Sequence, residues 1–205
     1  MKLKKYYSHL NGYEWIQFHK PELWKEIEDV IKAIDAKNFK NKIGKEKGNK
    51  GKRLYSPTDL NKEFDNQFLS RGWNRQEKEY FYCSDDPYIN KKLLEMDFKD
   101  QQRFRDDNPN INLQKSYNSK DFDKEKIAIE VQMGKYSFVQ FDIFIKHAAD
   151  YMKGLIEVGV EIVPMKSMEK EMSSGPPYFE KHLHEIQRQG RIFPPVPIVL
   201  IGIEP

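Results

Sequence analysis

Acidic and amide side chains in the segment 121–135, DFDKEKIAIEVQMGK, have types and a spacing that could hold a divalent cation. Asp121 precedes Glu130 by nine residues (130 − 121), and Gln132 follows two positions after Glu130. Mg²⁺ prefers oxygen ligands and takes only one or two carboxylates while it keeps several waters. The backbone carbonyl of Val131 is a third candidate ligand. A metal ion held there could polarise a phosphoryl oxygen and activate a water, which Gln132 could orient.

The same segment alternates like a strand with one buried face over residues 127–133. Its odd positions are all apolar, and its even positions are Ala128, Glu130 and Gln132. We expect the even positions to face solvent. An acid and an amide on the solvent face of a strand are ordinary, so the pattern alone leaves a purely structural interpretation open. Asp123 is a competing acid, seven residues before Glu130 (130 − 123).

Strands alternate with helices along the chain, which predicts an α/β fold with a central mixed β-sheet flanked by helices. A nearly all-apolar strand at the C-terminus is typical of a strand covered on both faces. The pattern predicts helices at 21–36, 56–71, 137–153 and 176–190, and strands at 73–83, 127–133, 156–165 and 197–203.

The predicted helix at 137–153 carries a stripe of apolar residues at helical spacing, which we expect to be buried. The same helix is a candidate dimer element. The stripe consists of Phe138, Phe141, Phe144, Ile145, Ala148 and Met152.

We expect residues 1–205 to form a single domain, with residues 117–205 as its core. Residues 85–116 have weak periodicity and several turn signals, so we expect an irregular lobe with one helix. Residues 37–53 are rich in lysine and glycine. This segment is either a mobile, solvated loop or an arm that touches phosphate.

Composition excludes several classes of protein. The net charge of +3, from 35 basic and 32 acidic residues, permits a nucleic-acid partner but does not argue for one. The single cysteine, Cys83, excludes an intramolecular disulfide and fits a reducing cytoplasm. The chain has no apolar run as long as a membrane span, so we expect no membrane partner. It has no glycine-rich phosphate loop, so we expect no nucleotide cofactor.

SYNSKDF at 116–122, followed by IAIEVQMGKYSF at 127–138, resembles the catalytic segment of the BglII and BstYI group of type II restriction endonucleases. This group belongs to the PD-(D/E)XK nuclease superfamily, and its members carry glutamine in place of the usual lysine. The likeness is closest to BstYI and spans nearly the whole chain, with the middle lobe matching least. Further matching segments are YSHLNG, AIDA, LYSP, VGVEIVPMK, KEMSSG, RQGR and VLIGI.

The resemblance implies a restriction endonuclease-like core and a Mg²⁺-dependent enzyme that acts on double-stranded DNA as a homodimer. Asp121 resembles the metal-binding aspartate of the group, Glu130 its second acid and Gln132 the replacement for lysine. The pattern of the group favours Asp121 over Asp123 as the ligand. An Asn or Glu that precedes these residues in some relatives has no clear counterpart here.

Five further residues are candidates for DNA contacts. Ser173 and Ser174 could cap the following helix, but the resemblance suggests a loop that enters the major groove, where hydroxyls bond to base edges. Lys135 is either a solvated lysine or a donor to guanine. Arg188 and Arg191 could contact phosphates.

The resemblance implies cleavage at a palindrome with a central GATC, written RGATCY, which leaves 5′-phosphate cohesive ends. Two other functions stay open. One is a PD-(D/E)XK nuclease of DNA repair, and the other is a DNA-binding protein whose catalytic site is silent. Retention of Asp121, Glu130 and Gln132 argues against the silent protein.

Overall fold

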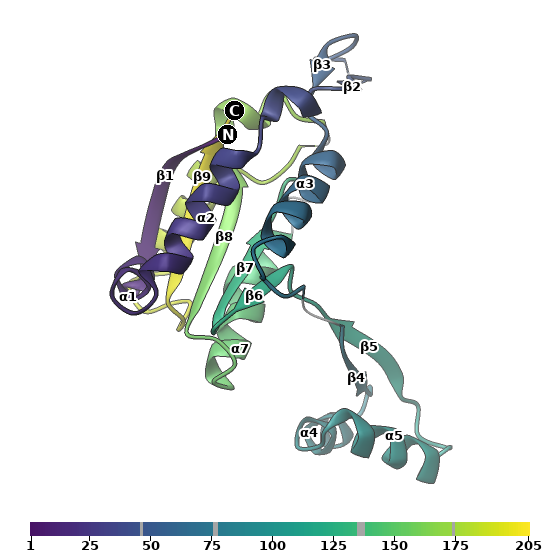
Figure 1. The fold of residues 1–205 in the computed structure, drawn as a ribbon. Coiled ribbons are helices and arrows are strands. Elements are labelled where there is room, and N and C mark those ends of the chain that lie inside the picture. Colours follow the sequence, from purple (N-terminus) through teal and green to yellow (C-terminus); the bar gives the residue numbers. More distant parts are fainter. Residues whose placement is uncertain (46, 76–77, 135–137, 174) are drawn as a thin grey trace. The chain divides into compact units, whose positions relative to one another are not determined.

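The structure is a computed structural model that describes residues 1–45, 47–75, 78–134, 138–173 and 175–205 (Figure 1). A five-stranded sheet with the order β1-β9-β8-β7-β6 forms its centre. The three central strands are parallel, and the two outer strands are antiparallel to their neighbours. The mixed sheet confirms the predicted fold class. The strands are β1 Lys2–His9, β6 Phe122–Lys124, β7 Ile127–Val131, β8 Val158–Pro164 and β9 Ile198–Glu204.

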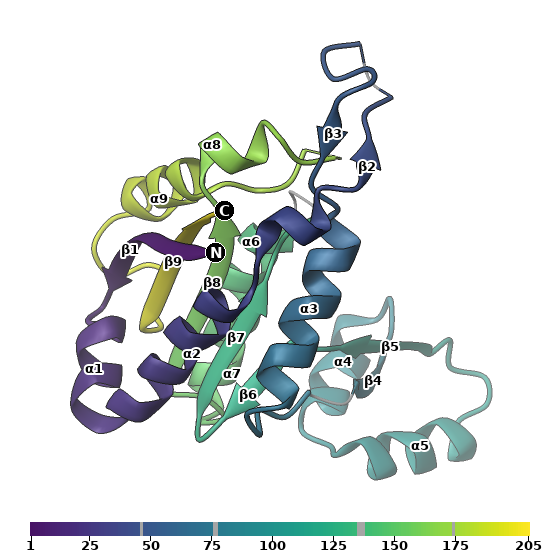
Figure 2. The same ribbon diagram turned by 45° about the horizontal axis from the view of Figure 1, so that its top comes forward.

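Helices cover both faces of this sheet (Figure 2). One face packs against α2 (Pro21–Ala33) and α3 (Pro57–Leu69). The other face packs against the helical segment 138–152 and α9 (Phe179–Arg188). The short helices α1 (Gly12–His19) and α8 (Lys166–Glu169) complete the set around the sheet.

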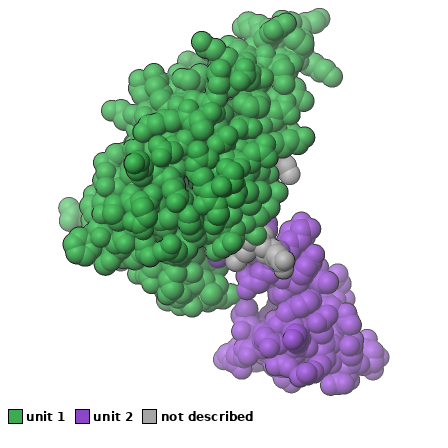
Figure 3. Space-filling view, viewed as in Figure 1, with its two compact units in different colours: residues 1–75, 121–205 green, residues 76–120 purple. Residues whose placement is uncertain are grey.

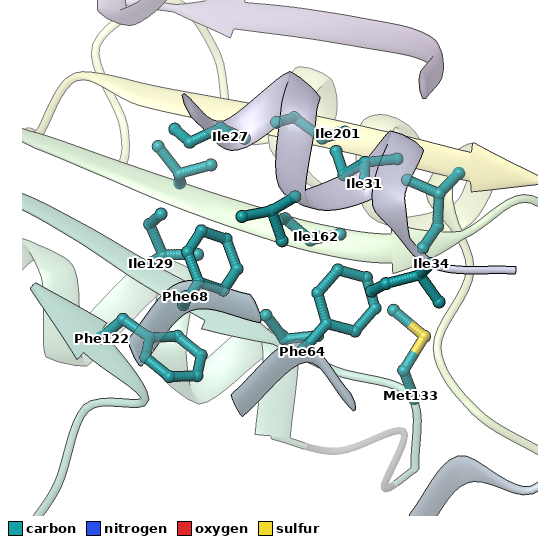
Figure 4. Packing of buried hydrophobic residues seen from close by; sticks show 14 of the residues in the cluster. Ile27, Ile31, Ile34, Phe64, Phe68, Phe122, Ile129, Met133, Ile162 and Ile201 are labelled. Atoms are coloured by element: carbon teal, nitrogen blue, oxygen red, sulfur yellow. The ribbon is translucent and has the colours of Figure 1, made fainter. Parts of the chain in front are cut away.

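The main core lies between the sheet and the pair α2 and α3 (Figure 4). Phe64 and Phe68 of α3 are fully buried, as are Ile129 and Ile162 of the sheet. Burying one such side chain contributes about 1.5–3 kcal/mol to stability. The Asp59 N–H donates to the Ser56 hydroxyl, so Ser56 caps the start of α3.

β7 is buried on both faces, so the expectation of solvent-facing even positions is wrong for Ala128 and Glu130. Gln132 follows the end of β7 and is half-buried. The odd positions pack toward α2 and α3, as predicted. On the other face, Ala128 packs with Val139 and Ile143 of the helical segment 138–152. Sequence alternation suggested solvent because Glu130 is polar, yet this helical segment covers it.

The helical segment 138–152 buries a different stripe from the predicted one. The segment consists of α6 (Phe138–Phe141), a π-helical turn (Asp142–Lys146) and α7 (His147–Met152). The π-helical turn departs from the 3.6-residue period on which the prediction depended. The buried face carries Val139, Asp142, Ile143, His147 and Asp150. Most of the predicted core stripe is exposed, at 44% for Phe138, 42% for Phe141, 56% for Ile145 and 74% for Met152.

The middle lobe, Gln76–Lys120, forms a compact unit of its own, and the rest of the chain forms the other (Figure 3). It holds an antiparallel pair, β4 (Glu79–Cys83) and β5 (Gln114–Asn118). It also holds two helices, α4 (Pro87–Leu94) and α5 (Phe98–Asp107), so the prediction of a single helix was wrong. Asp86 and Asp97 cap these short helices, and an aspartate at each start was the sequence signal that indicated two helices. The single-domain organisation stays a prediction.

The lysine-rich segment 37–53 contains local structure where a loop was expected. A 3₁₀ turn covers Ala36–Phe39, and the two-residue strands β2 (Lys42–Ile43) and β3 (Arg53–Leu54) pair with each other. Within the described ranges, none of the helices is long and apolar enough to cross a membrane.

Candidate active site

Asp121 and Glu130 are tied to each other through the backbone. The Val131 N–H donates to Asp121 Oδ2 at 2.9 Å, and the Asp121 N–H donates to Glu130 Oε1 at 3.4 Å. Asp121 lies just before β6, and Glu130 lies on β7, which pairs with β6. The antiparallel pairing thus brings together two acids that are separated in sequence.

Gln132 and Glu130 both connect to the π-helical turn. Gln132 Nε2 donates to Asp142 Oδ2 at 3.0 Å. Lys146 Nζ lies 2.7 Å from Asp142 Oδ1 and 2.7 Å from Glu130 Oε1. We call Asp121, Glu130, Asp142 and Lys146 the charged cluster. The sequence pattern did not predict Asp142 or Lys146 as residues of the site.

Burial dominates the electrostatics of the charged cluster. It raises the pKa of Asp121 and Asp142 and raises that of Glu130 well above its ordinary range. Lys146 opposes the shift at Glu130, while the negative charge of Asp121 adds to it. For Lys146, burial alone would lower the pKa, but Glu130 and Asp142 raise it above its ordinary value. The cluster therefore holds three carboxyl groups and one ammonium group in a poorly solvated place.

A second buried pair of ionisable side chains, Glu161 and His147, lies next to Glu130. Glu161 on β8 is the register partner of Glu130 on β7 and is fully buried. His147 Nε2 lies 3.2 Å from Glu161 Oε1, and both side chains are inaccessible to solvent. A Cβ atom at Gly159 would approach the His147 ring to 2.6 Å, so this close packing requires glycine there.

Gln132 lines a hollow of about 690 Å³. One wall belongs to α3, from which Asn61 and Asp65 line the hollow. The charge of Asp65 raises the pKa of Asp121, after the larger effect of burial. Gly134 and Phe138 also line the hollow. The charged cluster is thus close to a cavity that a ligand could enter.

The donor set of this site fits a hard divalent cation. Two carboxylates with raised pKa values are held together, and a divalent cation would relieve their repulsion. Within the described residues, both contacts to Glu130 engage Oε1, which leaves Oε2 as the oxygen to face an ion. No group of three His, Cys, Asp or Glu side chains in the described part of the chain could by itself hold a metal ion. The remaining ligands would have to be backbone oxygen and water.

The backbone of Val131 faces Asp121. Its N–H bonds to Asp121, and the N–H and C=O of one strand residue point to the same side. The neighbouring Gln132 N–H bonds instead to Ile162 of β8 at 3.0 Å. The Val131 carbonyl therefore points to the Asp121 side of β7.

The described candidates for DNA contacts, Ser173, Arg188 and Arg191, lie in other segments of the chain than the residues of the charged cluster. Lys135 and Ser174 lie outside the described residues. Ser173 donates its N–H to the Tyr55 carbonyl at 3.2 Å, next to the basic hairpin 42–54. Arg188 ends α9 and pairs with Glu185 at 2.6 Å, and Arg191 is exposed beyond it.

Two solved structures resemble this fold. The crystal structure of restriction endonuclease BglII complexed with a DNA 16-mer matches with a TM-score of 0.66 at 18% identity. It covers 100% of this chain and 79% of that chain. The structure of free BglII matches with a TM-score of 0.56 at 16% identity, covering 100% of this chain and 80% of that one. At these identities the likeness shows a shared fold.

The sequence itself identifies the family. Residues 4–203 match the family described as restriction endonuclease BglII/BglIII. The chain therefore belongs to this family of restriction endonucleases, which are site-specific nucleases. No curated protein matches the chain.

Proposed function

We propose that this protein is a Mg²⁺-dependent type II endonuclease that cleaves double-stranded DNA at the palindrome RGATCY and leaves 5′-phosphate cohesive ends. It acts as a cytoplasmic homodimer of the PD-(D/E)XK superfamily, closest to BstYI. The observation that carries the proposal is the backbone-tied pair of Asp121 and Glu130 beside Gln132. Membership of the BglII/BglIII family supports it.

Each residue of the site has a separate role in this proposal. Asp121, Glu130 and the Val131 carbonyl hold the Mg²⁺ ion. When bound, this ion would polarise the phosphoryl oxygen and lower the pKa of a water. Gln132 orients the water that attacks the phosphorus. It does not act as the base, because a carboxamide does not accept a proton from water near neutral pH. Its bond to Asp142 fixes the direction of the amide.

The basic hairpin 42–54 supports a DNA-binding face. Its strand β3 leads into Tyr55, which forms a parallel bridge with Met172. Ser173 and the hairpin thus border one hollow of about 260 Å³, lined also by Lys42 and Lys45. We propose that the hairpin contacts phosphates while Ser173 and Ser174 read base edges with Lys135. Arg188 and Arg191 are proposed as further phosphate contacts.

The exposed apolar stripe on the helical segment 138–152 supports the homodimer. Ile145 and Met152 are 56% and 74% exposed, an arrangement that fits a surface covered by a second copy. A palindromic target mirrors a two-fold axis in the protein, so each subunit would place one catalytic centre on one strand.

Digestion of a sequenced plasmid with Mg²⁺, followed by mapping of the ends, tests this function. We expect cuts at RGATCY sites with 5′-phosphate overhangs. Random nicking would favour the alternative of a repair nuclease. Specific binding without cleavage would favour a catalytically silent DNA-binding protein.

A further inference from the structure

A phosphodiester that enters the candidate active site meets a surplus of negative charge. The Asp121 N–H contacts Glu130, and Lys146 bridges the carboxyl groups of Glu130 and Asp142. A divalent cation balances two of these charges, and the phosphate adds another. Gln132 cannot supply the missing positive charge, because its carboxamide is neutral.

Lys146 brings an ammonium group to the side of Gln132. Lys146 Nζ is 2.7 Å from Asp142 Oδ1, and Gln132 Nε2 is 3.0 Å from Asp142 Oδ2. The two nitrogens are therefore neighbours across a single carboxyl group. Lys146 and Gln132 thus share Asp142 as a partner.

The ammonium is also next to a candidate metal ligand, at 2.7 Å from Glu130 Oε1. The Lys146 side chain is 10% exposed, whereas those of Glu130 and Asp142 are 2% exposed. Lys146 is thus the member of this ion-paired group with the most access to the surroundings.

The local backbone singles out the same residue. Asp142 and Lys146 are the first and last residues of the π-helical turn. Single π-helical turns inside helices often occur at functional sites. Here the turn places both charged groups toward the buried side of the segment, against β7.

We propose that Lys146 is a catalytic residue whose ammonium contacts the scissile phosphate and supplies the positive charge that Gln132 lacks. This inference rests on the proposed endonuclease function. On DNA binding, the ammonium exchanges its contact with Asp142 for a phosphate oxygen and keeps its contact with Glu130.

Four proteins test the proposal: wild type, Lys146→Gln, the charge-conserving double variant Gln132→Lys/Lys146→Gln, and the control Lys153→Gln. Lys153 is exposed at the end of α7. Three quantities are measured after thermal melting has verified the fold. They are single-turnover cleavage at saturating Mg²⁺, DNA affinity against salt concentration with Ca²⁺ in place of Mg²⁺, and Mn²⁺ binding by the free protein.

We expect Lys146→Gln to cut about 100-fold or more slowly, as when one donor to a developing charge is removed. Its plot of log affinity against log salt should become shallower by about 0.9 for each phosphate that Lys146 neutralises, or about two for a dimer. Mn²⁺ affinity should not fall, because a competing cation has been removed. The double variant should regain about tenfold or more of the cleavage rate, since a lysine at 132 restores the ammonium. Lys153→Gln should behave as wild type.

A merely structural lysine would give a different result. Folded Lys146→Gln would then cut at nearly the wild-type rate, or its salt slope would be unchanged, and either result overturns the proposal. If the single variant does not fold, the double variant decides, because a folded but inactive double variant also overturns it. Failure of the underlying function is distinguishable, because wild type itself would then leave GATC-containing DNA uncut.

Discussion

Glu130 and Glu161 occupy the same register position on the parallel strands β7 and β8, with at most 2% of either residue exposed. Burial raises the pKa of both carboxyl groups well above the ordinary glutamate value of 4.5. An acid whose pKa is raised by folding contributes stability below its unfolded pKa. That stability is lost as the pH rises through its folded pKa.

The first prediction is that Glu161→Gln stabilises the metal-free protein increasingly as the pH rises above 4.5, because glutamine has no proton to lose. The measurement is the difference in melting temperature between variant and wild type from about pH 5 to about pH 9. His182, whose pKa burial lowers to about 4, has the opposite dependence but is common to both proteins. A difference in melting temperature that shrinks with rising pH would contradict the raised pKa of Glu161.

The second prediction concerns the exposed stripe of the segment 138–152. Ile145→Glu should convert a dimer into a monomer, because a charge at the centre of an apolar interface is costly to bury. Phe18→Glu is the matched control, since Phe18 is 82% exposed on α1. Sedimentation measures both. A wild-type protein that sediments as a monomer, free and on DNA, would reject the proposed homodimer.

The third prediction is relaxed choice of the outer base pair. Discrimination of A from G needs a bidentate partner worth about 1–3 kcal/mol, whereas the lysine and short hydroxyls at 135, 173 and 174 give less. Four oligonucleotide duplexes that differ only outside GATC are digested under identical conditions. We expect cutting wherever a purine precedes and a pyrimidine follows the core. Cutting of AGATCT alone would show strict readout.

The fourth prediction is that the basic hairpin contributes affinity without sequence preference. Lys45, Lys47 and Lys50 are exposed on it. Replacing all three by glutamine should reduce the salt slope of DNA binding by about 0.9 for each phosphate that these lysines neutralise in the wild type. Discrimination between GATC and other sequences should not change. Lys25→Gln on α2 is the control, and an unchanged slope in the triple variant would support a merely solvated hairpin.

Sequence periodicity predicted β7, β8 and β9, the central strands of the sheet, because they are apolar and buried. It missed β6, which has only three residues. The alternation at 127–133 correctly placed Ile129 and Val131 in the main core. It misplaced Glu130, because alternation reports polarity and cannot reveal that a second layer covers a polar face. The N-terminal strand Lys2–His9 was missed, since its mostly exposed lysines and tyrosines hide the pattern.

The candidate site was predictable only in part. Asp121, Glu130 and Gln132 fall within one short segment, and the pairing of β6 with β7 brings Asp121 to Glu130. Asp142 and Lys146 reach the site through a π-helical turn, which helical periodicity cannot reveal. The signal available in the sequence was their i,i+4 spacing on the side of the helix opposite the apolar stripe, which also suits an ordinary exposed ion pair.

The central claim is that Asp121 and Glu130 form the metal-dependent catalytic centre. The most direct test compares Asp121→Asn with Asp123→Asn, since Asp123 lies within β6 and pairs its backbone with Asn74. Mg²⁺-dependent cleavage and Ca²⁺-supported binding of a GATC duplex are measured for both variants. We predict that Asp121→Asn abolishes cleavage with binding largely intact, while Asp123→Asn cuts nearly as wild type does. Near-normal cleavage by Asp121→Asn would contradict the claim.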